Sequence, residues 1–160
     1  MKTLIVYYSL TGNTEYAAKQ LAEKVNADLV KLKPDSEPPK QGRMMFVKGG
    51  FSALRHKTPE LEPLKVNLDD YDLIIIGTPI WAGTYTPAIG SFIKNCDLKA
   101  KKIAVFVSSS SGEGKKAIKQ LEDKLGVTSR LELILTDPLI HKDSEDPKIE
   151  EFAKELIQLR

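Results

Sequence analysis

The sequence predicts an α/β fold in which helices cover both faces of a doubly wound, five-stranded parallel sheet. Strand-like and helix-like segments alternate along the chain, as they do in repeated strand–helix–strand units. Two strand-like segments, residues 71–77 and 102–108, are apolar on both faces, which is typical of central strands in a parallel sheet. The length of 160 residues suits one domain, so we expect residues 1–160 to form a single unit with the strand order 2-1-3-4-5.

The first part of the chain contains two predicted strands and one helix. Residues 3–8, TLIVYY, are β-branched and aromatic and predict a buried strand. Residues 13–25 carry apolar side chains on one helical stripe, and Asn26 is the expected C-terminal cap. Residues 27–33 alternate between apolar and polar side chains and predict an edge strand.

The second part continues the alternation after a long connection. Residues 34–70 are long for a connection, and the segment 42–55 within them predicts a short helix broken at two adjacent glycines. The later elements follow from apolar runs, from helical stripes and from Pro or Gly at helix ends. They are a strand at 71–77, a helix opened by Thr86 and Pro87, a strand at 102–108, a helix at 114–125 stopped by Gly126, a strand at 130–136, and a last helix that starts at Asp146 and Pro147.

Three loops are expected to meet at one edge of this sheet. In an open α/β sheet, ligands bind beyond the carboxyl ends of the strands, near the point where the strand order reverses. Under the expected order, the loops after the first, third and fourth strands lie at that edge. These loops, residues 9–14, 78–86 and 108–114, are among the richest in glycine and hydroxyl groups. We therefore expect a ligand to bind there.

The first loop, SLTGNT, places hydroxyl and amide side chains around Gly12 at a strand-to-helix corner. The N-terminus of a helix attracts anions, and the hydroxyls of Ser9, Thr11 and Thr14 can donate to phosphate oxygens. Neither G-x-x-x-x-G-K-S/T nor G-x-G-x-x-G is present, so the pattern indicates a site for one terminal phosphate. A capped helix that binds no ligand is the alternative interpretation.

The second and third loops supply an aromatic ring and small polar groups. Trp81, the only tryptophan, lies between Pro79 and Gly83, where we expect it to stack on a planar ring. Packing of the indole against a neighbouring helix is the alternative. Residues 108–114 offer small hydrogen-bond donors, although a plain serine-rich turn has the same composition. Together the three loops predict a ligand with a phosphate tail and a flat heteroaromatic head, such as FMN.

These loops resemble those of flavodoxins and flavodoxin-like FMN proteins, and the likeness runs from end to end of the chain. SLTGNT resembles their phosphate-loop signature S/T-x-T-G-x-T, and residues 77–93, GTPIWAGTYTPAIGSFI, resemble the loop and helix that bear the flavin-stacking aromatic residue. The absence of a long insertion within residues 128–140 is similar to the short-chain form. The resemblance implies a flavodoxin fold that binds FMN tightly without a covalent bond.

Carried over by position, the resemblance also implies which residues contact FMN. The first loop is implied to hold the phosphate, Trp81 to stack on the ring, and the third loop to border the pyrimidine side. A peptide that turns its carbonyl toward flavin N5 is implied at Ala82–Gly83. No catalytic residue or metal ligand is implied. The implied cofactor-binding residues are Ser9, Leu10, Thr11, Gly12, Asn13, Thr14, Thr78, Pro79, Ile80, Trp81, Ala82, Gly83, Thr84, Ser108, Ser109, Ser110, Ser111 and Gly112.

Two functions are compatible with these loops. The first is an electron-transfer protein that passes electrons between redox partner proteins. The alternative is an FMN-dependent NAD(P)H:quinone-type oxidoreductase on the same fold. The short chain favours the carrier. The pI near 8.5 and the lack of an aromatic residue in the third loop favour the enzyme, because electron-carrying flavodoxins are typically acidic.

Two further classes of protein are disfavoured. A receiver domain needs an acidic cluster after the first strand and an aspartate after the third, where this chain has SLTG and TPIW. A hydrolase is disfavoured because no G-x-S-x-G motif is present and neither His56 nor His141 lies in a recognisable motif.

Composition limits the expected partners. The formal net charge of +2 argues against a nucleic-acid partner, and no segment approaches the ~20 apolar residues of a membrane span. Cys96 is the only cysteine, so we expect a soluble cytoplasmic protein, monomeric or weakly dimeric. Between residues 31 and 57, Lys and Arg far outnumber acidic residues. They could dock an acidic redox partner or a pyridine nucleotide's phosphate, and a solvated surface is the alternative.

Overall fold

Five parallel strands form one sheet in the computed structural model, which describes residues 1–38 and 58–159. The strand order is β2-β1-β3-β4-β5, which confirms the predicted doubly wound topology. The elements in chain order are β1 (Thr3–Tyr7), α1 (Asn13–Val25), β2 (Asp28–Lys31), the 3-10 helix η2 (Leu68–Asp70), β3 (Leu73–Pro79), α3 (Pro87–Asn95), β4 (Lys102–Ser109), α4 (Lys115–Leu125), β5 (Glu132–Thr136) and α5 (Lys142–Gln158).

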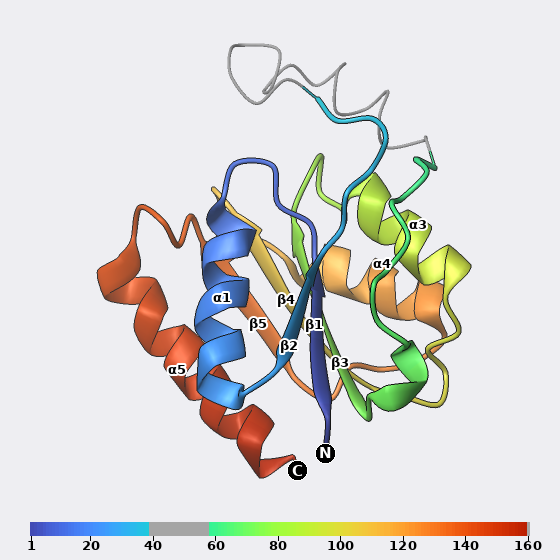
Figure 1. Cartoon of the computed structure of the whole chain (residues 1–160). Helices are drawn as coiled ribbons and strands as arrows, with labels where there is room; N and C mark the ends of the chain where they lie inside the picture. Colours follow the sequence, from blue (N-terminus) through green and yellow to red (C-terminus); the bar gives the residue numbers. More distant parts are fainter. Residues whose placement is uncertain (39–57, 160) are drawn as a thin grey trace.

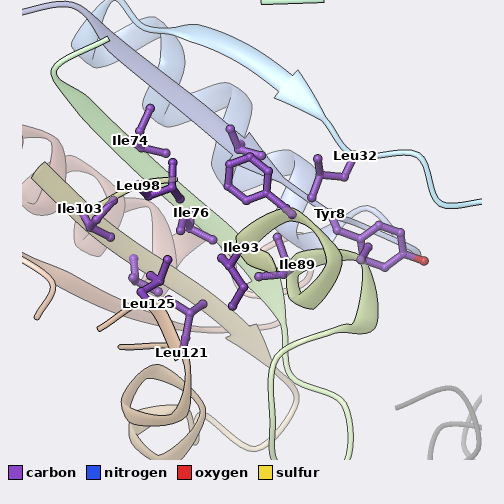
Figure 2. Close-up of a cluster of buried hydrophobic side chains, with 14 of the residues drawn as sticks. Tyr8, Leu32, Ile74, Ile76, Ile89, Ile93, Leu98, Ile103, Leu121 and Leu125 are labelled. Atoms are coloured by element: carbon purple, nitrogen blue, oxygen red, sulfur yellow. The ribbon is translucent and has the colours of Figure 1, made fainter. Parts of the chain in front are cut away.

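Helices cover both faces of the sheet (Figure 1). On one face, α1 and α5 pack side by side, and Phe152 of α5 lies in the same apolar cluster as Ile75 of β3. On the other face, α3 and α4 contribute Ile89 and Leu121 to a second cluster with Ile76 of β3 (Figure 2). The central strands are therefore buried on both faces, as their continuous apolar runs predict.

The register brings the ends of β1, β3 and β4 to one edge. In the pairing of β1 with β3, Tyr7 lies opposite Gly77, and in the pairing of β3 with β4, Pro79 lies opposite Ser108. Just past the end of β1, the amide of Tyr8 still donates to the carbonyl of Gly77 at 3.1 Å. Since β1 has β2 on one side and β3 on the other, the strand order reverses here, where such folds bind ligands.

The last helix begins earlier than the sequence predicts. We expected Asp146 and Pro147 to open it, but α5 starts at Lys142 and Pro147 lies inside the helix. The reason is a tertiary contact: the buried Glu145 carboxylate accepts the amide of Thr136 at 2.9 Å, which fixes the first turn of the helix against the end of β5. Pro147 has no amide hydrogen, so α5 lacks the helical hydrogen bond that residue 147 would make to the carbonyl of Asp143.

Two further findings bear on the sequence predictions. The short helix predicted within residues 42–55 lies outside the described residues. Among the helices of the described ranges, none combines the length and the apolar character needed to cross a lipid bilayer.

Candidate functional site

The loop after β1 turns sharply at Gly12 and leads directly into α1. Gly12 has a φ of 101°, a left-handed conformation that glycine adopts without strain. Its amide donates to Ser9 Oγ at 3.1 Å, which closes the turn. No side chain among the described residues caps the N-terminus of α1. The amides of this first turn therefore keep their donor capacity for an anionic ligand.

A loop that the sequence did not point to lies against this turn. The amide of Leu139, in the loop after β5, donates to Asn13 Oδ1 at 3.0 Å. A Cβ added to Gly12 would lie 3.2 Å from Leu139 Cδ1, so glycine is favoured here by space as well as by φ. The amide of Asp137 also donates to the carbonyl of Ser109 at 3.1 Å. The Asp137–Pro138 dipeptide marks a loop, but only the fold places that loop beside Gly12.

Thr14 joins the first loop to the third. Its side chain is buried, and Thr14 Oγ1 lies 2.8 Å from Ser108 Oγ, which is also buried. The two hydroxyls hydrogen-bond to each other, which ties the first turn of α1 to the end of β4. Ser9 and Leu10 are buried as well, whereas Thr11 is exposed at the tip of the loop. In this conformation, Thr11 and the main-chain amides are the donors most open to a ligand.

The second loop contains a tight hairpin turn. The amide of Trp81 donates to the carbonyl of Thr84 at 2.9 Å, and the amide of Thr84 donates to the carbonyl of Trp81 at 3.1 Å. The two central residues, Ala82 and Gly83, have φ angles of 48° and 78°, as a type I′ turn requires. Both are exposed, so the Ala82–Gly83 peptide forms the tip of the turn.

Thr78 anchors both ends of this loop and is itself fully buried. Its hydroxyl donates to the carbonyl of Pro79 at 2.9 Å and accepts the amide of Thr86 at 3.2 Å. Thr86 precedes the first residue of α3, so the hairpin is held between β3 and α3. In this arrangement, Thr78 orients the loop and its side chain does not reach solvent.

Trp81 is buried, whereas we expected it to be exposed enough to act as a stacking platform. Its relative exposure is 9%, and its ring meets the ring of Tyr8 edge-on, with centroids 5.6 Å apart and an interplanar angle of 84°. Trp81 and Tyr8 belong to the same apolar cluster as Ile89 of α3. Figure 2 shows Tyr8 at the end of this cluster, beyond Ile89. The indole therefore packs edge-on against Tyr8 in this conformation, and stacking on a ligand stays a prediction.

A cavity lies between the second and third loops. Its volume is about 480 Å³, and it is lined by Ile80, Gly83 and residues 109–114 together with the first residues of α4. The amide of Ile80 donates to the carbonyl of Ser108 at 2.9 Å, so the two loops share a hydrogen bond at its base. The structure therefore places most of the residues predicted to border the ring around one space.

The third loop is folded on itself beside this cavity. Ser109 Oγ donates to the carbonyl of Glu113 at 2.8 Å, and the amide of Glu113 donates to Ser111 Oγ at 3.3 Å. Gly112 has a φ of 72°, and an added Cβ would lie 2.8 Å from Thr136 Oγ1. Ser110 is exposed and lines the cavity.

The fold and the site define a doubly wound α/β protein whose ligand edge combines an uncapped helix N-terminus with a polar cavity. Sequence comparison then assigns the family. The chain belongs to the flavodoxin family, whose profile matches residues 2–144. Both the family and the fold class predicted from the sequence are confirmed.

Several solved structures are similar to this chain. A candidate flavoprotein from Bacteroides uniformis ATCC 8492 is 28% identical, with 84% of this chain and 88% of that chain covered and a TM-score of 0.72. A flavoprotein from Lactobacillus acidophilus NCFM in complex with FMN is 21% identical, with 88% and 97% covered and a TM-score of 0.72. Two-electron reduced Megasphaera elsdenii flavodoxin is 19% identical, with 94% and 97% covered and a TM-score of 0.55. At these identities, the last two show the shared fold alone.

Proposed function

We propose that this protein is an electron carrier that uses noncovalently bound FMN. FMN is the cofactor that membership of the flavodoxin family indicates, and a relative with the same fold forms a complex with FMN. When bound, FMN supplies one-electron and two-electron redox chemistry through its flavin ring. The protein's own part is to bind the group, orient it and keep water from one side of it.

The observation that carries the proposal is the junction of the three loops at the sheet edge. The Thr14–Ser108 hydrogen bond of 2.8 Å links the first loop to the third, and the Ile80–Ser108 hydrogen bond of 2.9 Å links the second to the third. The first turn of α1 and the second loop are thereby both linked to Ser108 at the end of β4. This arrangement supports a ligand with a phosphate at one end and a flat ring at the other.

The residues present fit such a group. The uncapped first turn of α1 offers amide donors, Thr11 offers an exposed hydroxyl, and the left-handed turn at Gly12 leads the chain directly into this helix. The serine-rich third loop offers donors to a polar ring edge at the cavity of about 480 Å³. The Ala82–Gly83 peptide lies exposed at the hairpin tip, where Gly83 lines the cavity.

The partners of a carrier are redox proteins that reach the exposed ring edge. We propose a cytoplasmic location, in line with the single cysteine, and a monomer or weak homodimer. Electrons arrive from one partner and leave to another, so the chain needs no substrate cavity of its own.

The purified protein tests the proposal directly. It is expected to be yellow, to release FMN on acid treatment, and to stay oxidised when NADH or NADPH is added without oxygen and without a helper reductase. A colourless protein that ignores added FMN would overturn the cofactor assignment. Rapid bleaching by NADH or NADPH alone would replace the carrier with a reductase.

A further inference from the structure

A second cavity lies beside the candidate cofactor site, in the groove between α3 and α4. Its volume is about 550 Å³, which falls in the range of small-molecule sites. Gly90 and Ser91 of α3 are among the small residues that line it, and the Ala82–Thr84 turn closes one end. Gly83 and Lys116 also line the cavity of the candidate cofactor site, so the two spaces adjoin.

Three lysines line this groove, and no acidic side chain is among its described lining residues. Lys116 and Lys124 stand two turns apart on one face of α4, with Gln120 midway, and Lys94 faces them from the last turn of α3. Within the described ranges, no carboxylate lies within 4.0 Å of any of the three ammonium groups. The groove therefore concentrates positive charge that an anion can balance.

The nearest carboxylates along α4 are engaged elsewhere. Asp123 pairs with Lys119 at 3.0 Å, and Glu122 accepts both the amide and the hydroxyl of Ser129 at 2.6 Å. The first turn of α4 adds to the positive field, because it carries Lys115 and Lys116 and no acidic residue. Lys115 is balanced by Glu132 at 2.7 Å, which leaves the charge of Lys116 directed at the groove.

The uncharged lining residues indicate the rest of the ligand. Tyr85 is half-buried in the wall, and burial raises the pKa of its phenol, so it stays a neutral hydrogen-bond donor with an aromatic face. Thr58 and Thr84 add hydroxyl groups. A ligand with a ring and a negatively charged tail suits this lining, because the ring can pack on Tyr85 while the tail reaches the lysines.

We propose that the groove between α3 and α4 binds a small organic phosphate with at least two negative charges, of the nucleoside diphosphate class. Phosphate oxygens pair with Lys94, Lys116 and Lys124, and the hydroxyl-lined end next to the hairpin takes the uncharged part. A hollow of this volume suits a small molecule better than the flatter contact of a protein partner. The described lining of the groove includes no residue of the phosphate loop around Gly12, although the groove shares Gly83 and Lys116 with the candidate cofactor cavity.

The test is a calorimetric titration of the full chain, with FMN added, at low ionic strength. The probes are ADP, pyrophosphate and adenosine. ADP and pyrophosphate are expected to bind with an affinity that falls as salt is added, and adenosine much more weakly. The variant Lys94→Gln/Lys116→Gln/Lys124→Gln is expected to bind ADP at least about tenfold more weakly, since it loses three charge-assisted contacts.

A matched control removes three other exposed lysines, which separates local contacts from net charge. The triple variant Lys65→Gln/Lys99→Gln/Lys154→Gln changes the charge equally and lies away from the groove, so its ADP affinity is expected to stay within about twofold. Failure of ADP and pyrophosphate to bind, or equal weakening in both triple variants, would overturn the proposal. So would binding of an acidic decapeptide in place of both phosphates. Flavin absorbance, recorded separately, reports whether the cofactor assignment holds.

Discussion

At the scale of single residues, both the backbone conformation and the available space restrict Gly12 in the first loop. Its φ of 101° and the closeness of Leu139 both disfavour a side chain. We expect Gly12→Ala to lower the free energy of unfolding by about 1 to 2 kcal/mol, because a left-handed alanine is strained. We also expect it to weaken FMN binding, measured by flavin fluorescence titration, because the turn that aims the α1 amides is distorted.

Gly126 provides the control for this prediction. It caps α4 with a φ of 69°, and an added Cβ would meet no atom within 4 Å. Gly126→Ala should therefore cost a similar stability while leaving FMN affinity unchanged. Equal FMN affinity in both variants would show that the turn at Gly12 does not hold the phosphate.

Trp81 is more buried in this structure than the stacking interpretation of the sequence led us to expect. Because its indole is 9% exposed and packs on Tyr8, Trp81→Ala should lower the free energy of unfolding of the FMN-free protein by about 3 kcal/mol. If the indole also stacks on the flavin, FMN affinity should fall about fivefold to tenfold, since such stacking is worth about 1 kcal/mol. Urea unfolding measures the first effect and flavin titration the second.

The conservative variant separates packing from stacking at this position. Trp81→Phe should keep much of the apolar contact with Tyr8 and retain an aromatic face. A Trp81→Ala protein that is destabilised but binds FMN as tightly as the parent would leave the indole a purely structural role.

At the scale of elements, the Thr14–Ser108 hydrogen bond couples α1 to β4. Thr14→Val and Ser108→Ala should each cost about 1 kcal/mol of stability, because each leaves the other buried hydroxyl without its partner. The double variant should cost less than the sum of the two. Urea unfolding of all four proteins measures this coupling.

A buried hydroxyl outside the site serves as the reference for the cycle. Ser91 donates to the carbonyl of Pro59 at 2.7 Å on α3, away from Thr14. The effects of Ser91→Ala and Thr14→Val should therefore add. Strict additivity between the stability effects of Thr14→Val and Ser108→Ala would contradict the role given to their contact.

FMN affinity should fall in both single variants of the coupled pair, because the first and third loops then move apart.

At the scale of the whole molecule, Glu145 is expected to set part of the acid stability. Burial raises the pKa of this carboxyl, but hydrogen bonds from Lys148, the Thr136 amide and Ser144 outweigh burial and lower the pKa below its ordinary value of 4.5. A carboxyl with a lowered pKa in the folded state adds stability above pH 4.5. That stability is lost as the pH falls through the folded-state pKa.

The prediction compares Glu145→Gln with the parent protein. The difference in unfolding free energy should be largest at neutral pH and should shrink as the pH falls below about 4.5. Glu151→Gln, an exposed position on the same helix, should show a much smaller difference at every pH. A difference in unfolding free energy between Glu145→Gln and the parent that stays constant down to pH 3 would contradict the linkage, because pH 3 lies well below the ordinary Glu pKa of 4.5.

The alternation of strands and helices and the buried central strands were predictable because local patterns carry them, whereas the strand order was expected from the fold class. The apolar runs of β3 and β4 can be buried only in the centre of a parallel sheet, and the SLTGNT corner signals its own helix start. The start of α5 was predicted wrongly because proline usually opens a helix. The hydrogen bond from the Thr136 amide to the Glu145 carboxylate joins α5 to the end of β5 and favours an earlier helix start. No local sequence signal indicates this contact.

The sequence by itself determined the family, the alternation of strands and helices, and the small polar residues at the ends of β1 and β4, since each follows from the chemistry of neighbouring residues. Only the tertiary structure decided that Leu139 lies against Gly12, that Trp81 turns inward onto Tyr8, and that lysines of α3 and α4 face one groove. These contacts join side chains that are far apart in the sequence and become neighbours only when the chain folds. The pattern of neighbouring residues therefore cannot predict them.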